Sequence, residues 1–161
     1  MRTLVVGGTG MLAGLVTALA NDGDDVTVLA RQGWKGRGPV QSIMVDYRNT
    51  KLLTLALDHN GLFDRMVAWI HSDAPGALVI LRQCVTGDVL HVLGSAAADP
   101  SFPVHAPAAG EPREVFLGFV REGVHSRWLT DAEISVGVLQ ALRGGEPRSV
   151  VGTVTPWSER P

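Results

Sequence analysis

The chain has 161 residues, of which 45% are apolar and 19% charged, and its formal net charge at pH 7 is -2. This length and composition are typical of one globular domain with one hydrophobic core, and they exclude a disordered chain. The near balance of 14 basic and 16 acidic side chains gives no electrostatic reason to expect nucleic acid or an anionic membrane as a partner.

The single cysteine, Cys84, cannot form a disulfide within the chain, which favours a reducing compartment such as the cytoplasm. The apolar run at 4–6 is too short for the core of a signal peptide, and no stretch reaches the roughly 20 apolar residues of a membrane span. The five histidines are scattered and do not pair at ligand spacing, so we expect no metal site. We therefore expect a soluble cytoplasmic protein.

Apolar periodicity and turn residues divide the chain into alternating strands and helices. In chain order, we expect a strand at 4–6, a helix at 11–20, strands at 26–30 and 42–45, a helix at 52–57, a strand at 65–70, a helix at 74–85, a strand at 88–93, a proline-rich loop at 96–112, a strand at 114–120, a helix at 130–143 and a strand at 149–154. This alternation predicts an α/β fold, a Rossmann-type doubly wound, mostly parallel sheet of six or seven strands with helices on both faces. We expect one domain of this fold over 1–161.

Five of the expected strands end at residues that suit a binding site. Doubly wound sheets bind ligands in a crevice beyond the carboxyl ends of their strands. We therefore expect these end residues to converge on one crevice: Gly7, Arg31, Asp46, His71 and Ser95.

A glycine-rich turn at 7–10 lies between the first expected strand and the first expected helix. There Gly7 permits a tight turn, and Gly10 leaves room for a pyrophosphate that the amides and dipole of the helix N-terminus would stabilise. Ala13 and Gly14 are small enough for close packing of the helix on the strand. A plain glycine turn is the alternative. The motif predicts that the following residues surround the pyrophosphate of a dinucleotide: Gly7, Gly8, Thr9, Gly10, Met11 and Leu12.

The end of the second expected strand indicates which dinucleotide binds. NAD sites usually carry a carboxylate there, whereas this chain has Arg31, with Lys35 and Arg37 close behind. A guanidinium can hold the 2′-phosphate of NADP, although a solvated basic loop would look the same. Asp46, after the third strand, is either an adenine contact or a turn residue.

Residues 7–12, Arg31 and Ser95 resemble the short-chain dehydrogenase/reductase superfamily, with a glycine spacing nearer to its extended and atypical members. The segment 126–133 is similar to the one that opens the last helix in such proteins. The chain resembles most a group of short bacterial members with a characteristic tail, which here reads Val151-Gly152-Thr153, Pro156-Trp157 and Arg160-Pro161. This resemblance covers almost the whole chain. It implies NADP as cofactor before NAD, oxidoreductase chemistry on an unknown small molecule, and, since the superfamily often assembles, a homodimer.

The superfamily's reductases use a serine and a Tyr-x-x-x-Lys motif, in which the tyrosine is the acid/base. Ser95 matches the serine, but no residue matches the other two. The only tyrosine, Tyr47, and both lysines, Lys35 and Lys51, precede the fourth strand. The proline-rich stretch 96–112 replaces the helix that should carry the motif. Carbonyl reduction by the standard route is therefore not expected.

Two histidine loops offer other groups for proton transfer. His71 follows the fourth strand and His125 the sixth, and a histidine can act as acid or base near neutral pH. Arg127 would suit a carboxylate or phosphate, and Ser72 joins Ser95 near the expected nicotinamide ribose. The alternative is that these loop residues cap helices and satisfy backbone groups.

The sequence leaves three functions open. One is an NADP-dependent oxidoreductase with a non-standard proton donor, and the second is a non-catalytic protein that senses or regulates through a bound dinucleotide. The third is a fold whose cofactor site is vestigial. Fold alone does not decide among them.

Overall fold

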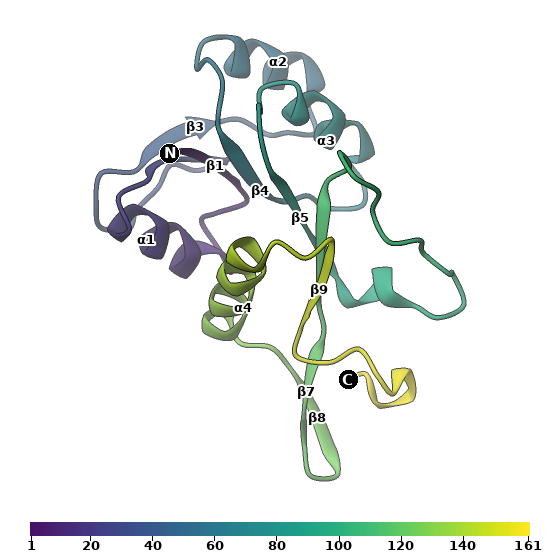
Figure 1. Ribbon diagram of the computed structural model, residues 1–161. Coiled ribbons are helices and arrows are strands. Elements are labelled where there is room, and N and C mark those ends of the chain that lie inside the picture. The colour runs from purple at the N-terminus through teal and green to yellow at the C-terminus, as the bar shows by residue number, and fades with distance from the viewer.

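The computed structural model describes residues 1–161 and contains a seven-stranded parallel sheet in the order β3-β2-β1-β4-β5-β6-β9 (Figure 1). This is the expected Rossmann-type α/β fold. The strands are β1 (Arg2–Val6), β2 (Asp25–Ala30), β3 (Gln41–Met44), β4 (Arg65–Trp69), β5 (Val89–Gly94), β6 (Arg113–Leu117) and β9 (Arg148–Val151).

The central strand β1 shows why the sheet is buried on both faces. Leu4 and Val6 belong to one core cluster and Val5 to the other, and all three side chains are fully buried. Successive side chains of a strand point to opposite faces, so a continuous apolar run requires cover on both sides.

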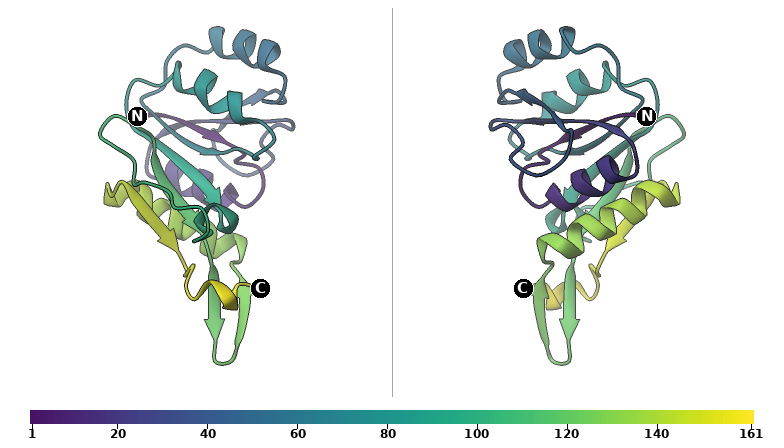
Figure 2. Two further views of the ribbon diagram at one scale, coloured as in Figure 1. Left: turned by 90° about the vertical axis from the view of Figure 1, so that its right-hand side faces the viewer. Right: turned by 90° about the vertical axis from the view of Figure 1, so that its left-hand side faces the viewer.

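Helices provide that cover. α1 (Ala13–Asn21) and α4 (Asp131–Gly144) pack together on one face, and α2 (Thr50–Asp58) and α3 (Pro75–Arg82) lie together on the other (Figure 2). None of the helices has both the length and the apolar content that crossing a membrane requires.

Local signals set the ends of two of these helices. The Asn49 side chain accepts a hydrogen bond from the Leu52 amide at 3.1 Å and caps α2. Thr130 and Glu133 form a reciprocal capping box at the start of α4. α4 ends at Gly145, whose φ of +79° favours glycine.

The expected strand at 114–120 is wrong as a single element. It consists of β6 and β7 (Phe119–Glu122), and β7 leaves the sheet to pair antiparallel with β8 (His125–Trp128). The break falls at Gly118, where a Cβ atom would overlap the carbonyl oxygen of Thr153. Residues Val151 and Thr153, near the end of the chain, therefore lie directly against Gly118. The β7–β8 hairpin projects beyond the sheet (Figures 1 and 2).

No α-helix connects β5 to β6. The chain makes one 3-10 turn, η1 (Ser95–Ala98), and then runs irregularly to β6, as the prolines of 96–112 predict. A second 3-10 turn, η2 (Trp157–Glu159), lies in the C-terminal tail. Glu159 in this turn forms an ion pair with Arg121 of β7, which ties the tail to the hairpin.

The close approach at Gly118 predicts a large effect of one added methyl group. Gly118→Ala should lower the free energy of unfolding by about 1–3 kcal/mol, because the new atom must push the Thr153 backbone away from β7. Gly144→Ala is the matched control, since no atom lies within 4 Å of a Cβ atom there and alanine favours the helix. Urea denaturation should therefore separate the two variants, and equal midpoints would contradict this packing.

Candidate functional site

The glycine turn leaves β1 in a conformation that only glycine adopts easily. Gly7 has a φ of +77°, and a Cβ atom there would lie 3.1 Å from the Trp69 carbonyl oxygen. The Gly7 amide donates to the Leu29 carbonyl at 3.0 Å. The turn is therefore held between the ends of β2 and β4.

The turn presents a row of free backbone donors. None of the amides of residues 8–12 donates a hydrogen bond within the chain. Thr9 and Gly10 are exposed, and no atom lies within 4 Å of a Cβ position at Gly10. Leu12 contributes only its backbone here, because its side chain is fully buried in the core. This arrangement fits the phosphates of a nucleotide cofactor.

The close packing of α1 differs from the expectation. Gly8, and not the pair Ala13-Gly14, lets the helix approach the sheet, since a Cβ atom there would lie 2.9 Å from Val16 and 3.1 Å from Val5. Gly14 instead allows α1 to approach α4, since a Cβ atom there would lie 3.0 Å from the Ser135 side chain. Packing within the chain therefore requires a glycine at position 8, whereas Gly10 faces open space.

A cavity of about 250 Å³ lies over the carboxyl ends of four strands and contains four of the five predicted end residues, Gly7, Arg31, Asp46 and His71. Arg31 is exposed and forms no ion pair with any carboxylate of the chain, so its guanidinium is free for a ligand.

Asp46 also serves the turn that follows β3. Its Oδ1 atom accepts a hydrogen bond from the Arg48 amide at 3.0 Å, and the Arg48 guanidinium lies 3.5 Å away. Asp46 is therefore a turn aspartate, as one interpretation of the sequence had it, and it also lines the cavity.

Arg48 is a cavity residue that the sequence did not single out. It forms an ion pair with Asp73 at 2.9 Å, and this hydrogen bond raises the pKa of Arg48 and lowers the pKa of Asp73. The pair joins the loop after β3 to the loop after β4. Because the two loops are distant in sequence, no local pattern identifies the contact.

A second cavity, of about 470 Å³, begins where the first ends. Trp69 and His71 line both cavities, and their rings meet edge to face at 5.7 Å. Ser72 and His91 also line the second cavity. Burial lowers the pKa of His91 from its ordinary value of 6.5, so this imidazole is neutral at pH 7.

Ser95 lies just behind the wall of this second cavity, which its neighbours Gly94 and Ala96 line. Its side chain is buried, and its hydroxyl accepts a hydrogen bond from Arg160 Nε at 2.8 Å. The structure thus brings Ser95, His71 and Ser72 to one region of the sheet edge.

His125 does not join this group. It pairs with Glu122 beside the turn of the β7–β8 hairpin, is exposed, and lines neither cavity. The sequence offered His125 as a group for proton transfer, but antiparallel pairing carries it to the hairpin tip, away from both cavities. Arg127 is likewise engaged, in ion pairs with Glu122 and with Glu133.

The single tyrosine has a structural role. Tyr47 is buried, and its hydroxyl accepts a hydrogen bond from the His71 amide at 3.1 Å. Lys35 and Lys51 are exposed, after β2 and in α2 respectively. No tyrosine–lysine pair therefore stands beside Ser95.

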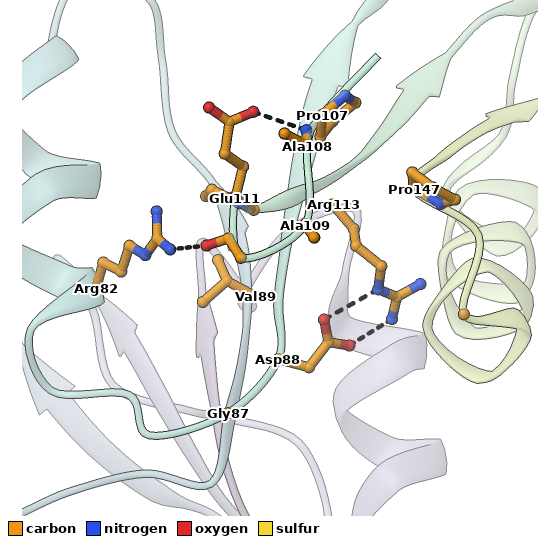
Figure 3. Close-up of a pocket in the computed structure, with 13 residues that line it drawn as sticks. Arg82, Gly87, Asp88, Val89, Pro107, Ala108, Ala109, Glu111, Arg113 and Pro147 are labelled. Atoms are coloured by element: carbon orange, nitrogen blue, oxygen red, sulfur yellow. Dashed lines mark hydrogen bonds and ion pairs between the residues drawn. The ribbon is translucent and has the colours of Figure 1, made fainter.

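A hollow of about 440 Å³ lies at the opposite edge of the sheet, by the amino ends of β5 and β6 (Figure 3). Its charged groups are used internally. Arg113 forms an ion pair with Asp88, with Nε 2.9 Å from Oδ1, and Arg82 donates to the Gly110 carbonyl oxygen. The glycine turn and four of the five predicted strand ends line the cavity at the carboxyl edge, so we place the candidate site there.

Three solved structures share this architecture. A short-chain dehydrogenase from Burkholderia cenocepacia in complex with NADP has a TM-score of 0.71 and 16% identity, over 95% of this chain and 88% of that one. A short-chain dehydrogenase/reductase from Serratia marcescens has a TM-score of 0.66 and 19% identity, over 92% and 94%. A short-chain dehydrogenase from Leptospira borgpetersenii with bound NAD+ has a TM-score of 0.64 and 13% identity, over 94% and 91%.

The sequence itself carries less of this likeness. No family model matches the chain, and no curated protein matches it. At identities below 20%, the structural likeness confirms the predicted Rossmann-type fold over nearly the whole chain.

The capping box of α4 predicts a pH-dependent stability. Hydrogen bonds from Arg127 and from the Thr130 amide lower the pKa of Glu133 from 4.5 to about 2. The carboxylate therefore stabilises the fold above pH 4.5, and this contribution is lost as the pH falls from 4.5 toward 2. Thermal melts should show wild type more stable than Glu133→Gln at pH 7, with the difference shrinking over that interval. A difference that persists at pH 2 would contradict this assignment.

Proposed function

We propose that this protein binds NADP(H) along the carboxyl edge of its sheet and is an oxidoreductase-like relative of the short-chain dehydrogenases/reductases that lacks the standard Tyr/Lys pair. The row of free amides at residues 8–12, facing open space at Gly10, is the observation that carries this proposal. Two of the similar structures are described with NADP and with NAD+.

The preference for NADP over NAD rests on charge. Arg31 lines the same cavity as the glycine turn and has no carboxylate partner in the chain. Asp46 is the one carboxylate that lines this cavity, and it is already paired with Arg48. A 2′-phosphate would therefore meet a free guanidinium, with no unpaired carboxylate on this wall.

Catalysis is favoured over sensing by the second cavity. Bound NADPH would supply a hydride, and the protein's part is to place an acceptor beside it. The 470 Å³ cavity next to His71 offers room for a small molecule, and only Ala96 and Ala97 of the proline-rich connection line it. The connection therefore leaves this space open, as an enzyme requires.

His71 is the proposed proton donor or acceptor, with Ser95 beside the substrate. His71 is exposed, lines both cavities, and receives orientation from the Trp69 ring and from the Tyr47 bond to its backbone. A histidine side chain can act as acid or base near neutral pH. His125 stands outside both cavities and is assigned no role.

Cofactor binding should raise the melting temperature. A ligand that binds only the folded state at a hundredfold excess over Kd adds about 2.7 kcal/mol of stability, which corresponds to roughly 5–11 °C for a chain of this size. We expect this shift with NADPH and a smaller one with NADH at the same concentration. Folded, cofactor-free protein that shifts with neither would support a vestigial site.

Arg31→Glu should weaken NADPH binding by roughly 10- to 100-fold and leave NADH nearly unchanged, because it removes about 1.5–3 kcal/mol of charge-assisted hydrogen bonding to the 2′-phosphate. Arg37→Glu, in the same basic loop but outside the cavity, is the matched control for net charge. Calorimetric titration measures both affinities. An unchanged NADPH/NADH ratio, or an equal loss in the control, would rule out the 2′-phosphate assignment.

Gly10→Val tests the phosphate cradle without disturbing the core. No atom lies within 4 Å of the new Cβ atom and the glycine has no positive φ, so the melting temperature of the free protein should hardly change. The branched side chain would stand in the space in front of the free amides, so affinity for NADPH and NADH should both fall at least tenfold. Undiminished affinity would place the phosphates elsewhere.

A further inference from the structure

Arg160, in the C-terminal tail, stacks between two indoles. Its guanidinium carbon lies 5.2 Å from the ring centre of Trp128 in β8 and 5.1 Å from that of Trp157 in η2. Such stacking fixes the plane of the guanidinium and restricts its rotamers. The hairpin and the tail thus hold one cation in a defined orientation.

The position of this cation is also defined. Arg160 Nε donates to the hydroxyl of the buried Ser95 at 2.8 Å, at the carboxyl end of β5. By the resemblance, Ser95 matches the serine that the superfamily's reductases use with their Tyr-x-x-x-Lys motif. The contact joins residues 65 positions apart, so the tail returns a charged group to the candidate site.

The remaining donors of this guanidinium are unused. Arg160 is exposed, its Nη atoms donate no hydrogen bond within the chain, and it is absent from the ion pairs that tie most other arginines to carboxylates. The only acid in η2, Glu159, is paired with Arg121. A planar, oriented guanidinium with two free nitrogens suits a bidentate oxyanion.

We propose, resting on the function proposed above, that Arg160 binds the carboxylate of the substrate beside Ser95, and that the substrates are small organic acids. A singly charged carboxylate matches one guanidinium. A phosphate dianion would find no second free cation there, since Arg121 and Arg127 are both paired with glutamates. The cavity of about 470 Å³ limits the substrate to a small molecule.

The test follows the Nε–Hε resonance of Arg160 in ¹H–¹⁵N spectra, assigned by its loss in Arg160→Gln, during titration with sodium acetate at constant ionic strength. We expect a saturable shift of this resonance and of the Ser95 amide, and at least tenfold weaker binding of inorganic phosphate. Arg160→Lys, which keeps the charge but not the planar pair of donors, should reduce acetate affinity at least tenfold, as judged from the Ser95 amide.

Two controls separate recognition from structural support. Arg121→Gln loosens the tail without removing the guanidinium, and it should retain acetate affinity within about threefold. The Nε–Hε resonance of Arg143 reports non-specific ionic effects, because this residue lies at the far end of α4 and is paired with Asp22. The proposal is overturned if the Arg160 resonance shows no saturable shift, if the Arg143 resonance shifts equally, or if phosphate binds more tightly than acetate. It is also overturned if Arg121→Gln loses as much acetate affinity as Arg160→Lys.

The same titration keeps this proposal distinct from the cofactor proposal. It is run on the free protein and again with saturating NADP+, while cofactor binding is read separately from the melting temperature. Cofactor binding without an acetate response would overturn the role of Arg160 alone. An acetate response without cofactor binding would overturn the proposed oxidoreductase function and leave an anion site at Ser95.

Discussion

The parallel pairing of β1 with β2 and β4 is the constraint on which the candidate site depends. In this register Val6 lies opposite both Leu29 and Ala68, so the three strands end almost level. The glycine turn, Arg31 and His71 therefore leave the sheet side by side and line one cavity. The burial of both faces makes this arrangement rigid, since every shift of β1 would move side chains in two core clusters.

Much of this arrangement follows from local sequence. The alternation of strands and helices arises from apolar residues, which are continuous in β1 and β4, and from turn residues such as Gly23. The glycine turn was predictable for the same reason, because its role depends on two neighbouring elements. The convergence of four strand ends then follows from parallel topology.

The contacts that the sequence did not reveal are those between distant segments. Gly118 ends β6 because residues 151–153 approach it, and a strand pattern that continues to Val120 carries no sign of that approach. The same holds for the Arg48–Asp73 ion pair and for the bond from Arg160 to Ser95. Each joins residues at least 25 positions apart, so only the folded chain shows them.

The connection between β5 and β6 bears on the proposed chemistry. In the reductases that the sequence resembles, a Tyr-x-x-x-Lys motif accompanies the serine, but here a 3-10 turn and a proline-rich stretch follow Ser95. The C-terminal tail supplies Arg160 instead. A guanidinium stays charged and cannot release a proton at neutral pH, so it can hold an anion but not act as the acid. We therefore propose that His71 transfers the proton and that Arg160 orients the substrate.

The most direct test of the central claim is a ¹H–¹⁵N spectrum of the labelled protein titrated with NADPH. If the cofactor phosphates lie on the glycine turn, the free amides of residues 8–12 should shift most, together with Arg31 at the end of β2. Shifts confined to the hollow at the opposite edge, around Gly110 and Arg113, or the absence of any shift, would contradict it.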